Sequence, residues 1–199
     1  MTNPNKKQTL LVTTGMNRMI KTAEDIEKIR EGGAHLARIL DTIVANVVPG
    51  SRTDELDDMA EKLMHSIGAM PAFKGYQPPG MRVPFNSTFC ACINDEVVHA
   101  PAHPGRVLKD GDIFSIDIGM VYKGRFTDMA ITIPVGTISS STKRLLEVTR
   151  QSLYDGLAQI KPGNSVRDIG RAVSKTVEKA GYSVVRALVG HGVGTWASR

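Results

Sequence analysis

Two aspartates occur where strand interiors usually exclude such residues. The stretch from Asp112 to Pro134 reads as two strands rich in β-branched and aromatic residues, joined by a tight turn at Lys123-Gly124. One strand carries Asp117 and the other carries Asp128. Pairing across a two-residue turn puts both side chains on one face as diagonal neighbours, about 7–8 Å apart at the backbone. Carboxylates this close can converge on shared cations, which would relieve the repulsion between like charges.

Two solvated aspartates on an open face would give the same pattern, but the apolar residues around both favour a metal site. A histidine would supply the nitrogen donor of a site for a first-row divalent ion. His191 lies between glycines that leave its imidazole accessible. His99 ends an expected strand that follows a turn at Asn94-Asp95 and comes just before the hairpin. Packing accounts for His35 and His65 on helical segments, and His103 lies in a proline-flanked loop.

Amphipathic helices precede the hairpin. From Thr22, which forms a capping arrangement with Asp25, apolar residues recur at helical spacing as far as Pro49-Gly50. A second helix is expected to be capped by Thr53 and to end at Gly68. The apolar stripe of the second helix is interpreted as core packing and not as a site.

The same helical pattern returns 113 residues later. Pro162-Gly163 matches Pro49-Gly50, and Gly181 matches Gly68. Amphipathic helices resemble one another by chance, but the shared break and the shared stop favour an internal duplication. The hairpin of the second unit would fall beyond Arg199, so we expect the second half of the sheet to be incomplete.

Between the second helix and the hairpin, residues 70–88 form a loop rich in proline and glycine that carries Phe73, Tyr76 and Phe85. Such loops often form the walls of binding sites. Aromatic side chains that merely pin a surface loop are an equally good interpretation. The loop is therefore a candidate binding wall and no more.

Composition indicates a soluble globular protein, with 41% hydrophobic and 23% charged residues. We expect a disordered tail over residues 1–20 and one domain over residues 21–199. The charge of +5 is spread along the chain, so no specific nucleic-acid partner is expected. No apolar run reaches the length of a membrane span. Cys90 and Cys92 lie too close for an unstrained disulfide, which favours a reducing cytoplasm.

Four ordered segments carry a resemblance to a known family. They are NDEVVH ending at His99, IDIG with Asp117, FTD with Asp128 and GHGVGT with His191, at intervals of eighteen, eleven and sixty-three positions. This succession resembles type I methionine aminopeptidase over almost the whole chain. The resemblance implies the pita-bread fold, an α+β architecture in which two pseudo-repeated halves surround an antiparallel sheet.

It also implies removal of the initiator methionine from nascent proteins by hydrolysis at a dinuclear metal site. Asp117, Asp128 and His191 would be ligands of two divalent ions, which are Co, Mn, Fe or Zn. His99 would be a catalytic histidine that contacts the substrate. The pocket for the methionine side chain would be lined by Tyr76, Phe85, Cys90 and Phe73.

The resemblance further implies a cytoplasmic monomer that acts on the N-termini of nascent polypeptides, with the ribosome as a candidate partner. The chain departs from the family after GHGVGT, where the family has a second histidine and then two glutamate ligands. Here Ser198 stands in place of that histidine, and no glutamate follows before Arg199. We therefore expect the chain itself to have little or no peptidase activity.

Three other interpretations remain. A proline-directed aminopeptidase shares these ligand types, but such proteins usually carry a sizeable domain ahead of the catalytic one, and DMAIT lacks the arginine often found in that strand. A non-catalytic pita-bread binding module would have little reason to keep Asp117, Asp128, His99 and His191 together. An unrelated α/β domain would need all four motifs to coincide.

Overall fold

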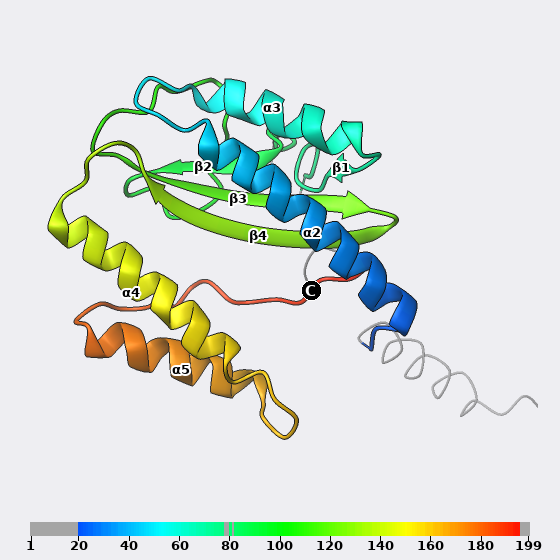
Figure 1. Ribbon diagram of the computed structural model, residues 1–199, viewed down its shortest axis with the longest axis vertical. Helices are drawn as coiled ribbons and strands as arrows, with labels where there is room; N and C mark the ends of the chain where they lie inside the picture. Colours follow the sequence, from blue (N-terminus) through cyan, green and yellow to red (C-terminus); the bar gives the residue numbers. More distant parts are fainter. Residues whose placement is uncertain (1–19, 78–79, 81, 196–199) are drawn as a thin grey trace, which may run out of the picture.

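A four-stranded antiparallel sheet organises the residues that the computed structural model describes, which are 20–77, 80 and 82–195 (Figure 1). Strand β3 (Ile113–Tyr122) pairs along one edge with β4 (Arg125–Pro134). Its other edge is shared by β1 (Met70–Pro71) and β2 (Phe89–Ile93). Strand β3 therefore contacts every other strand of the sheet.

The hairpin of β3 and β4 has the turn and register expected from the sequence. Lys123 and Gly124 have φ values of 49° and 73°, as a two-residue type I′ turn requires. Tyr122 lies opposite Arg125. The match between turn and strand twist fixes the register along both strands.

Helices α2 (Ala23–Ala45) and α3 (Thr53–Ser66) pack against the sheet to form the core (Figure 1). The predicted cap of α2 is confirmed, because the Thr22 hydroxyl accepts from the N–H of Asp25 and the Asp25 carboxylate accepts from the N–H of Thr22. The core combines apolar side chains of both helices with those of the strands. It includes Leu36, Ile39, Leu40, Ile43, Leu56, Ala60, Met64, Phe89, Phe114, Ile116, Ile118 and Met120.

Helices α4 (Ser140–Leu157) and α5 (Val166–Lys179) form a second pair beyond β4 (Figure 1). Both ends of α5 lie 113 residues after the ends of α3, so the helix expected from the repeat is confirmed. At their contact, a Cβ at Gly156 would come within 3.0 Å of Val173 Cγ2. Glycine at this position lets the two helices approach closely.

Two local predictions are wrong. Arg52 occupies the cap position of α3, and Thr53 is its buried first residue, whose hydroxyl donates to the carbonyl of Ala102 at 2.7 Å. Strand β2 ends at Ile93 and the expected turn at Asn94-Asp95 follows, but the strand expected after that turn, ending at His99, does not form. Residues 94–99 form a turn and loop, in which residues 94 and 99 both have positive φ.

The expected N-terminal tail covers residues 1–20, of which 1–19 lie outside the described part of the chain. Ile20 is exposed. None of the helices in the described ranges is both long enough and apolar enough to cross a membrane.

Candidate metal centre

Asp117 and Asp128 project from adjacent strands on the same face of the hairpin. Asp128 lies opposite Gly119, two residues beyond Asp117 along β3, and Asp117 lies opposite Ala130. The two carboxyl groups are close enough to share a hydrogen bond. The predicted diagonal pair is therefore present in the structure.

Burial is the main influence on both carboxyl groups. Burial, followed by the neighbouring negative charge of Asp128, raises the pKa of Asp117 to about 6. Burial also raises the pKa of Asp128, while His191 and the hydrogen bond from Asp117 act in the opposite direction. Below about pH 6 such a pair can share a proton, and above it the two negative charges favour a bound cation.

His191 reaches this pair from a segment far along the chain. Its Nε2 lies 3.7 Å from Asp128 Oδ2, and its Nδ1 lies 3.1 Å from the carbonyl oxygen of Gly192. Because that carbonyl can only accept, a hydrogen bond there requires the proton on Nδ1, so in the neutral imidazole the lone pair is on Nε2, the nitrogen that faces Asp128. The segment is fixed to the sheet where the N–H of Phe126 donates to the carbonyl of Gly194 at 2.7 Å.

His99 adjoins the site through its backbone. Its N–H points to the thiol of Cys90, which lies opposite Asp117 in the register of β2 and β3. The imidazole itself is exposed, on a residue with a φ of 62°. The loop conformation, which replaces the expected strand, therefore presents His99 at the rim of the site.

The four predicted pocket residues fall into two groups. Cys90 and Phe73 adjoin the carboxylates, because Cys90 pairs with Asp117 and the Phe73 ring packs over Gly119. A Cβ at Gly119 would come within 2.6 Å of that ring. Burial, with the nearby charge of Asp117, raises the pKa of the Cys90 thiol to about 12, so it remains protonated.

Tyr76 and Phe85 lie further out, on the loop between β1 and β2. The N–H of Phe85 donates to the carbonyl of Tyr76, and the N–H of Tyr76 donates to the carbonyl of Phe73. These bonds hold the three aromatic residues in one closed loop. The side chain of Tyr76 is exposed, and that of Phe85 is partly buried.

A second group of potential metal ligands was missed by sequence reasoning. Asp57, Asp58 and His103 each place a donor atom within 4.8 Å of the others. Nothing in the local sequence indicates this group, because it joins a helix to a loop more than forty residues away. The adjacent aspartates alone are typical of a solvated helix face.

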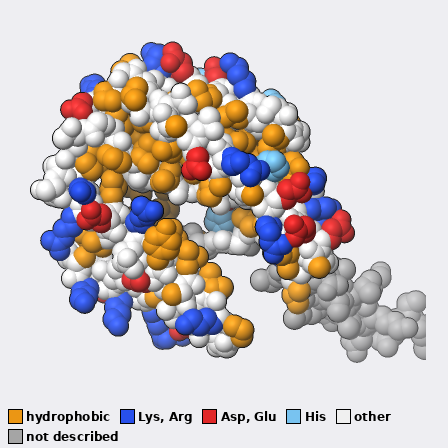
Figure 2. All heavy atoms as spheres, viewed as in Figure 1, with side chains coloured by type: hydrophobic (Ala, Val, Ile, Leu, Met, Phe, Trp, Pro, Cys, Tyr) orange, Lys and Arg blue, Asp and Glu red, His pale blue; other side chains and the backbone are white. Residues whose placement is uncertain are grey.

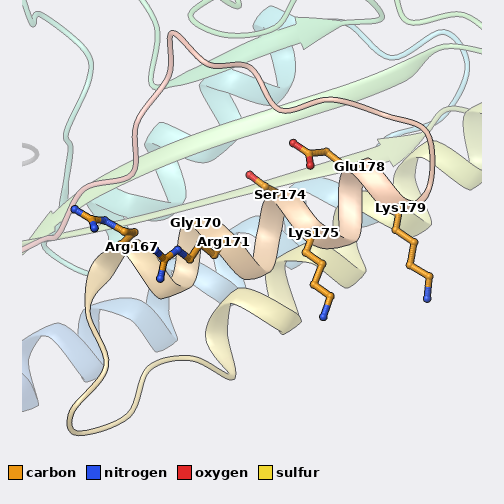
Figure 3. Close-up of a pocket in the computed structure, with 7 residues that line it drawn as sticks. All are labelled: Arg167, Gly170, Arg171, Ser174, Lys175, Glu178 and Lys179. Atoms are coloured by element: carbon orange, nitrogen blue, oxygen red, sulfur yellow. The ribbon is translucent and has the colours of Figure 1, made fainter.

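A basic stripe on α5 also went unnoticed in the sequence. Arg167, Arg171, Lys175 and Lys179 recur at every fourth position and border a hollow of about 670 Å³ (Figure 3). Figure 3 shows the four side chains extending outward from the helix. Residues four apart share one helix face, so their charges add on that face.

The chain is similar to known metallopeptidases over most of its length. The model of metallopeptidase family M24 matches residues 27–197. Methionine aminopeptidase 1 of Bacillus subtilis is 45% identical over 175 residues, covering 87% of this chain and 67% of that protein. Methionine aminopeptidase of Aquifex aeolicus is 41% identical, covering 85% of this chain and 66% of that protein. The chain thus spans about two thirds of the length of the curated relatives that it matches.

Solved structures agree with the sequence relatives. The crystal structure of a methionine aminopeptidase from Thermotoga maritima matches with a TM-score of 0.84 and 35% identity, covering 90% of this chain and 70% of that one. A prolidase from Pyrococcus horikoshii matches with a TM-score of 0.78 at 20% identity, over 92% of this chain and 49% of that one, which is a likeness of fold alone. The pita-bread fold expected from the sequence is confirmed.

Proposed function

Since the chain belongs to metallopeptidase family M24, we propose that it acts as a methionine aminopeptidase, which removes the initiator methionine from nascent polypeptides. The observation that carries this proposal is the buried pair of Asp117 and Asp128 facing His191. The names of the relatives support the same substrate class.

Asp117, Asp128 and His191 are the proposed metal ligands. The donor set fits, because two carboxylates whose pKa values are raised by burial and an imidazole with a free Nε2 suit first-row divalent ions. We propose two such ions, from among Co, Mn, Fe and Zn. When bound, they would supply a water of lowered pKa and polarise the scissile carbonyl.

The residues around the carboxylates would receive the methionine side chain. Cys90 stays protonated and buried, and Phe73 covers Gly119, so both present soft apolar surface next to the reacting bond. A flexible thioether packs well against such surface. Tyr76 and Phe85 would close the outer wall, and His99 at the rim would donate a hydrogen bond to the substrate as charge develops.

We propose that residues 1–199 by themselves hydrolyse peptides slowly or not at all. The sequence holds three of the proposed ligands but no glutamate after Glu178, and a carboxylate base is the usual partner of such a site. Ser198, which stands in place of a second histidine, lies outside the described residues. Methionine release should therefore rise when the C-terminal third of the Bacillus subtilis relative is joined to this chain.

Metal binding provides the direct test of the site. Calorimetric titration with Mn²⁺ or Co²⁺ should show binding that Asp117→Asn weakens by more than about tenfold, as loss of a charged ligand predicts. A matched control is Asp112→Asn, at the foot of the same hairpin, where the carboxylate bonds to Asn94 instead. Equal affinity in wild type and Asp117→Asn would refute the assignment.

Substrate choice separates the proposal from proline-directed cleavage. The joined chain should release methionine from a Met-Ala-Ser peptide and leave an Ala-Pro-Ser peptide intact. The opposite preference would favour the prolidase interpretation, and binding of peptide without cleavage would favour a non-catalytic module. The structural likeness to prolidases extends only to the fold.

The basic stripe on α5 supports the ribosome as a partner. Four cations on one exposed helix face suit contact with a phosphate backbone, and such contacts weaken steeply with salt. Co-sedimentation with ribosomes should fall in Lys175→Ala/Lys179→Ala and persist in Lys62→Ala, the matched lysine of α3. Contacts of cations with phosphates do not depend on the base sequence, so no specific nucleic acid is proposed.

We place the protein in the cytoplasm as a monomer. Cys90 and Cys92 are both free and buried, which suits a reducing compartment. Fractionation of cells and sedimentation of the purified protein would test these two assignments.

A further inference from the structure

Asp57, Asp58 and His103 form a second carboxylate–imidazole group, built from different elements than the candidate metal centre. The two aspartates lie in the second turn of α3, and the histidine lies in the loop between β2 and β3. His103 Nε2 is 3.3 Å from Asp57 Oδ2 and 3.8 Å from Asp58 Oδ1. One donor atom from each residue thus converges on one point.

Asp57 is the unusual member of this group. Its side chain is 0% exposed, and its Oδ1 accepts from the N–H groups of Thr88 and Phe89 at 2.8 and 3.0 Å. Its Oδ2 is buried and has no hydrogen-bond partner among the described residues, although it faces His103. A buried carboxylate oxygen without a partner destabilises the fold, and a bound cation would offset that cost.

We propose that Asp57, Asp58 and His103 bind one divalent cation of the zinc class, at a site separate from Asp117, Asp128 and His191. Two carboxylate oxygens and an imidazole nitrogen are a donor set that Zn²⁺ accepts, with water in the fourth position. In a tetrahedral site with metal–ligand distances of about 2.0–2.2 Å, ligand atoms lie about 3.3–3.6 Å apart. The observed separations of 3.3 and 3.8 Å are close to this geometry.

The site is accessible to an ion from solvent. The side chain of Asp58 is 56% exposed and that of His103 is 30% exposed, whereas Asp57 forms the buried floor. An ion could therefore enter between the two outer ligands and meet the unsatisfied oxygen. The competing interpretation is a plain ion pair between Asp57 and a protonated His103.

A bound ion would join α3 to the segment that carries His99. Pro101 forms a bridge with Cys90, and the carbonyl of Ala100 accepts from the N–H of Ala91, so this segment runs beside β2. His103 anchors its far end to α3. The ion would thus hold in place the loop that presents His99 at the rim of the candidate metal centre.

The experiment titrates Zn²⁺ into a background that lacks the other site. In the double variant Asp117→Asn/Asp128→Asn, calorimetry should show one bound Zn²⁺ per chain. Adding His103→Asn, or independently Asp58→Asn, should weaken that binding by more than about tenfold. Loss of a residue that only hydrogen-bonds to a metal ligand can already have an effect of this size. The matched control is His65→Asn, which removes an exposed histidine from α3, the helix of Asp57 and Asp58, and should leave the affinity unchanged.

Co²⁺ supplies a second readout that an ion pair would not give. In the same background, its visible d–d absorption should show a tetrahedral nitrogen–oxygen site that disappears with His103→Asn. No binding in the double variant, or binding that both His103→Asn and Asp58→Asn leave intact, would overturn the proposal. Because the background lacks Asp117 and Asp128, failure here leaves the proposed peptidase site untouched, and the reverse also holds.

Discussion

The two helix pairs share a sequence pattern but differ in burial. Helices α2 and α3 bury five residues each, among them Leu40 and Met64, whereas α5 buries none among the residues described. Leu153 matches Leu40 at an offset of 113 residues, yet it is 55% exposed where Leu40 is 6% exposed. The same apolar sequence pattern is therefore buried in the first helix pair and largely exposed in the second.

The sheet accounts for the difference. Helices α2 and α3 pack on β-strand side chains, while α4 and α5 pack mainly on each other through Gly156 and its neighbours. Figure 2 shows basic side chains along the outer margin of the second pair and hydrophobic ones on its inner side. Amphipathic periodicity thus predicts a helix and its apolar face, but burial of that face depends on a partner surface.

Truncation of matched leucines should give the largest contrast between the two pairs. Leu40→Ala should lower the free energy of unfolding by about 2–5 kcal/mol, because it opens a cavity in the core. Leu153→Ala should change it by less than about 0.5 kcal/mol, because that side chain is already in water. Urea denaturation of both variants provides the measurement, and equal losses would break the comparison.

A second contrast concerns Asp57, whose match in α5 is Gly170. In metal-free protein, Asp57→Ala should cost about 1–3 kcal/mol, because the buried N–H groups of Thr88 and Phe89 lose their acceptor. Asp57→Asn keeps an acceptor and should cost clearly less. Thermal unfolding of the two variants in EDTA would measure this, and identical losses would show that those hydrogen bonds are not the cause.

The two regions should also respond oppositely to pH. The folded-state pKa of Asp117 is raised to about 6 by burial and Asp128, so between about 4 and 6 the folded protein binds more protons than the unfolded one. This contribution makes the metal-free protein more stable as the pH falls through that range. Hydrogen bonds lower the pKa values of Asp155, from Thr176, and Asp168, from the Ser165 backbone, so their stabilisation is lost only at lower pH.

Thermal unfolding in EDTA at pH 7, 6 and 5 would check this sign. Wild type should gain stability on acidification, and Asp117→Asn should gain less because it has no proton to bind there. A wild-type protein that loses stability steadily from pH 7 to pH 5 would contradict the raised pKa.

Glycines in the second pair should give the smallest effects. A Cβ at Gly170 would meet no atom within 4 Å, so Gly170→Ala should raise the free energy of unfolding by about 0.5–1 kcal/mol through helix propensity. Gly156→Ala should destabilise instead, because its Cβ would press on Val173. Circular dichroism during urea denaturation would compare them, and a gain from both would mean that α4 and α5 are not closely packed.

The sequence predicted features set by local pattern. The hairpin with Asp117 and Asp128 follows from strand periodicity and a two-residue turn, and its register is confirmed. The presence of helix α5 follows from the repeat. These features depend on residues near one another in the chain, where the steric rules of turns and helices apply directly.

Features that depend on long-range packing were not predicted. Thr53 was expected to cap a helix because of its residue type, but its hydroxyl instead ties α3 to Ala102. The convergence of Asp57 on His103 needs the folded arrangement of a helix and a distant loop. The turn expected at Asn94-Asp95 is present, but the strand expected after it, ending at His99, is a loop in the structure.

The hydrogen bond from the N–H of Phe126 to the carbonyl of Gly194 holds the segment of His191 against the sheet. This bond can form only late in synthesis, because Gly194 is made long after Phe126. Asp117 and Asp128 lie on neighbouring strands and can come together as soon as the hairpin leaves the ribosome, whereas His191 is made 63 residues after Asp128. Closing a loop of that length costs about 4 kcal/mol of chain entropy. His191 is therefore the last of the three side chains to reach the site. A ligand bound by all three side chains would hold it there.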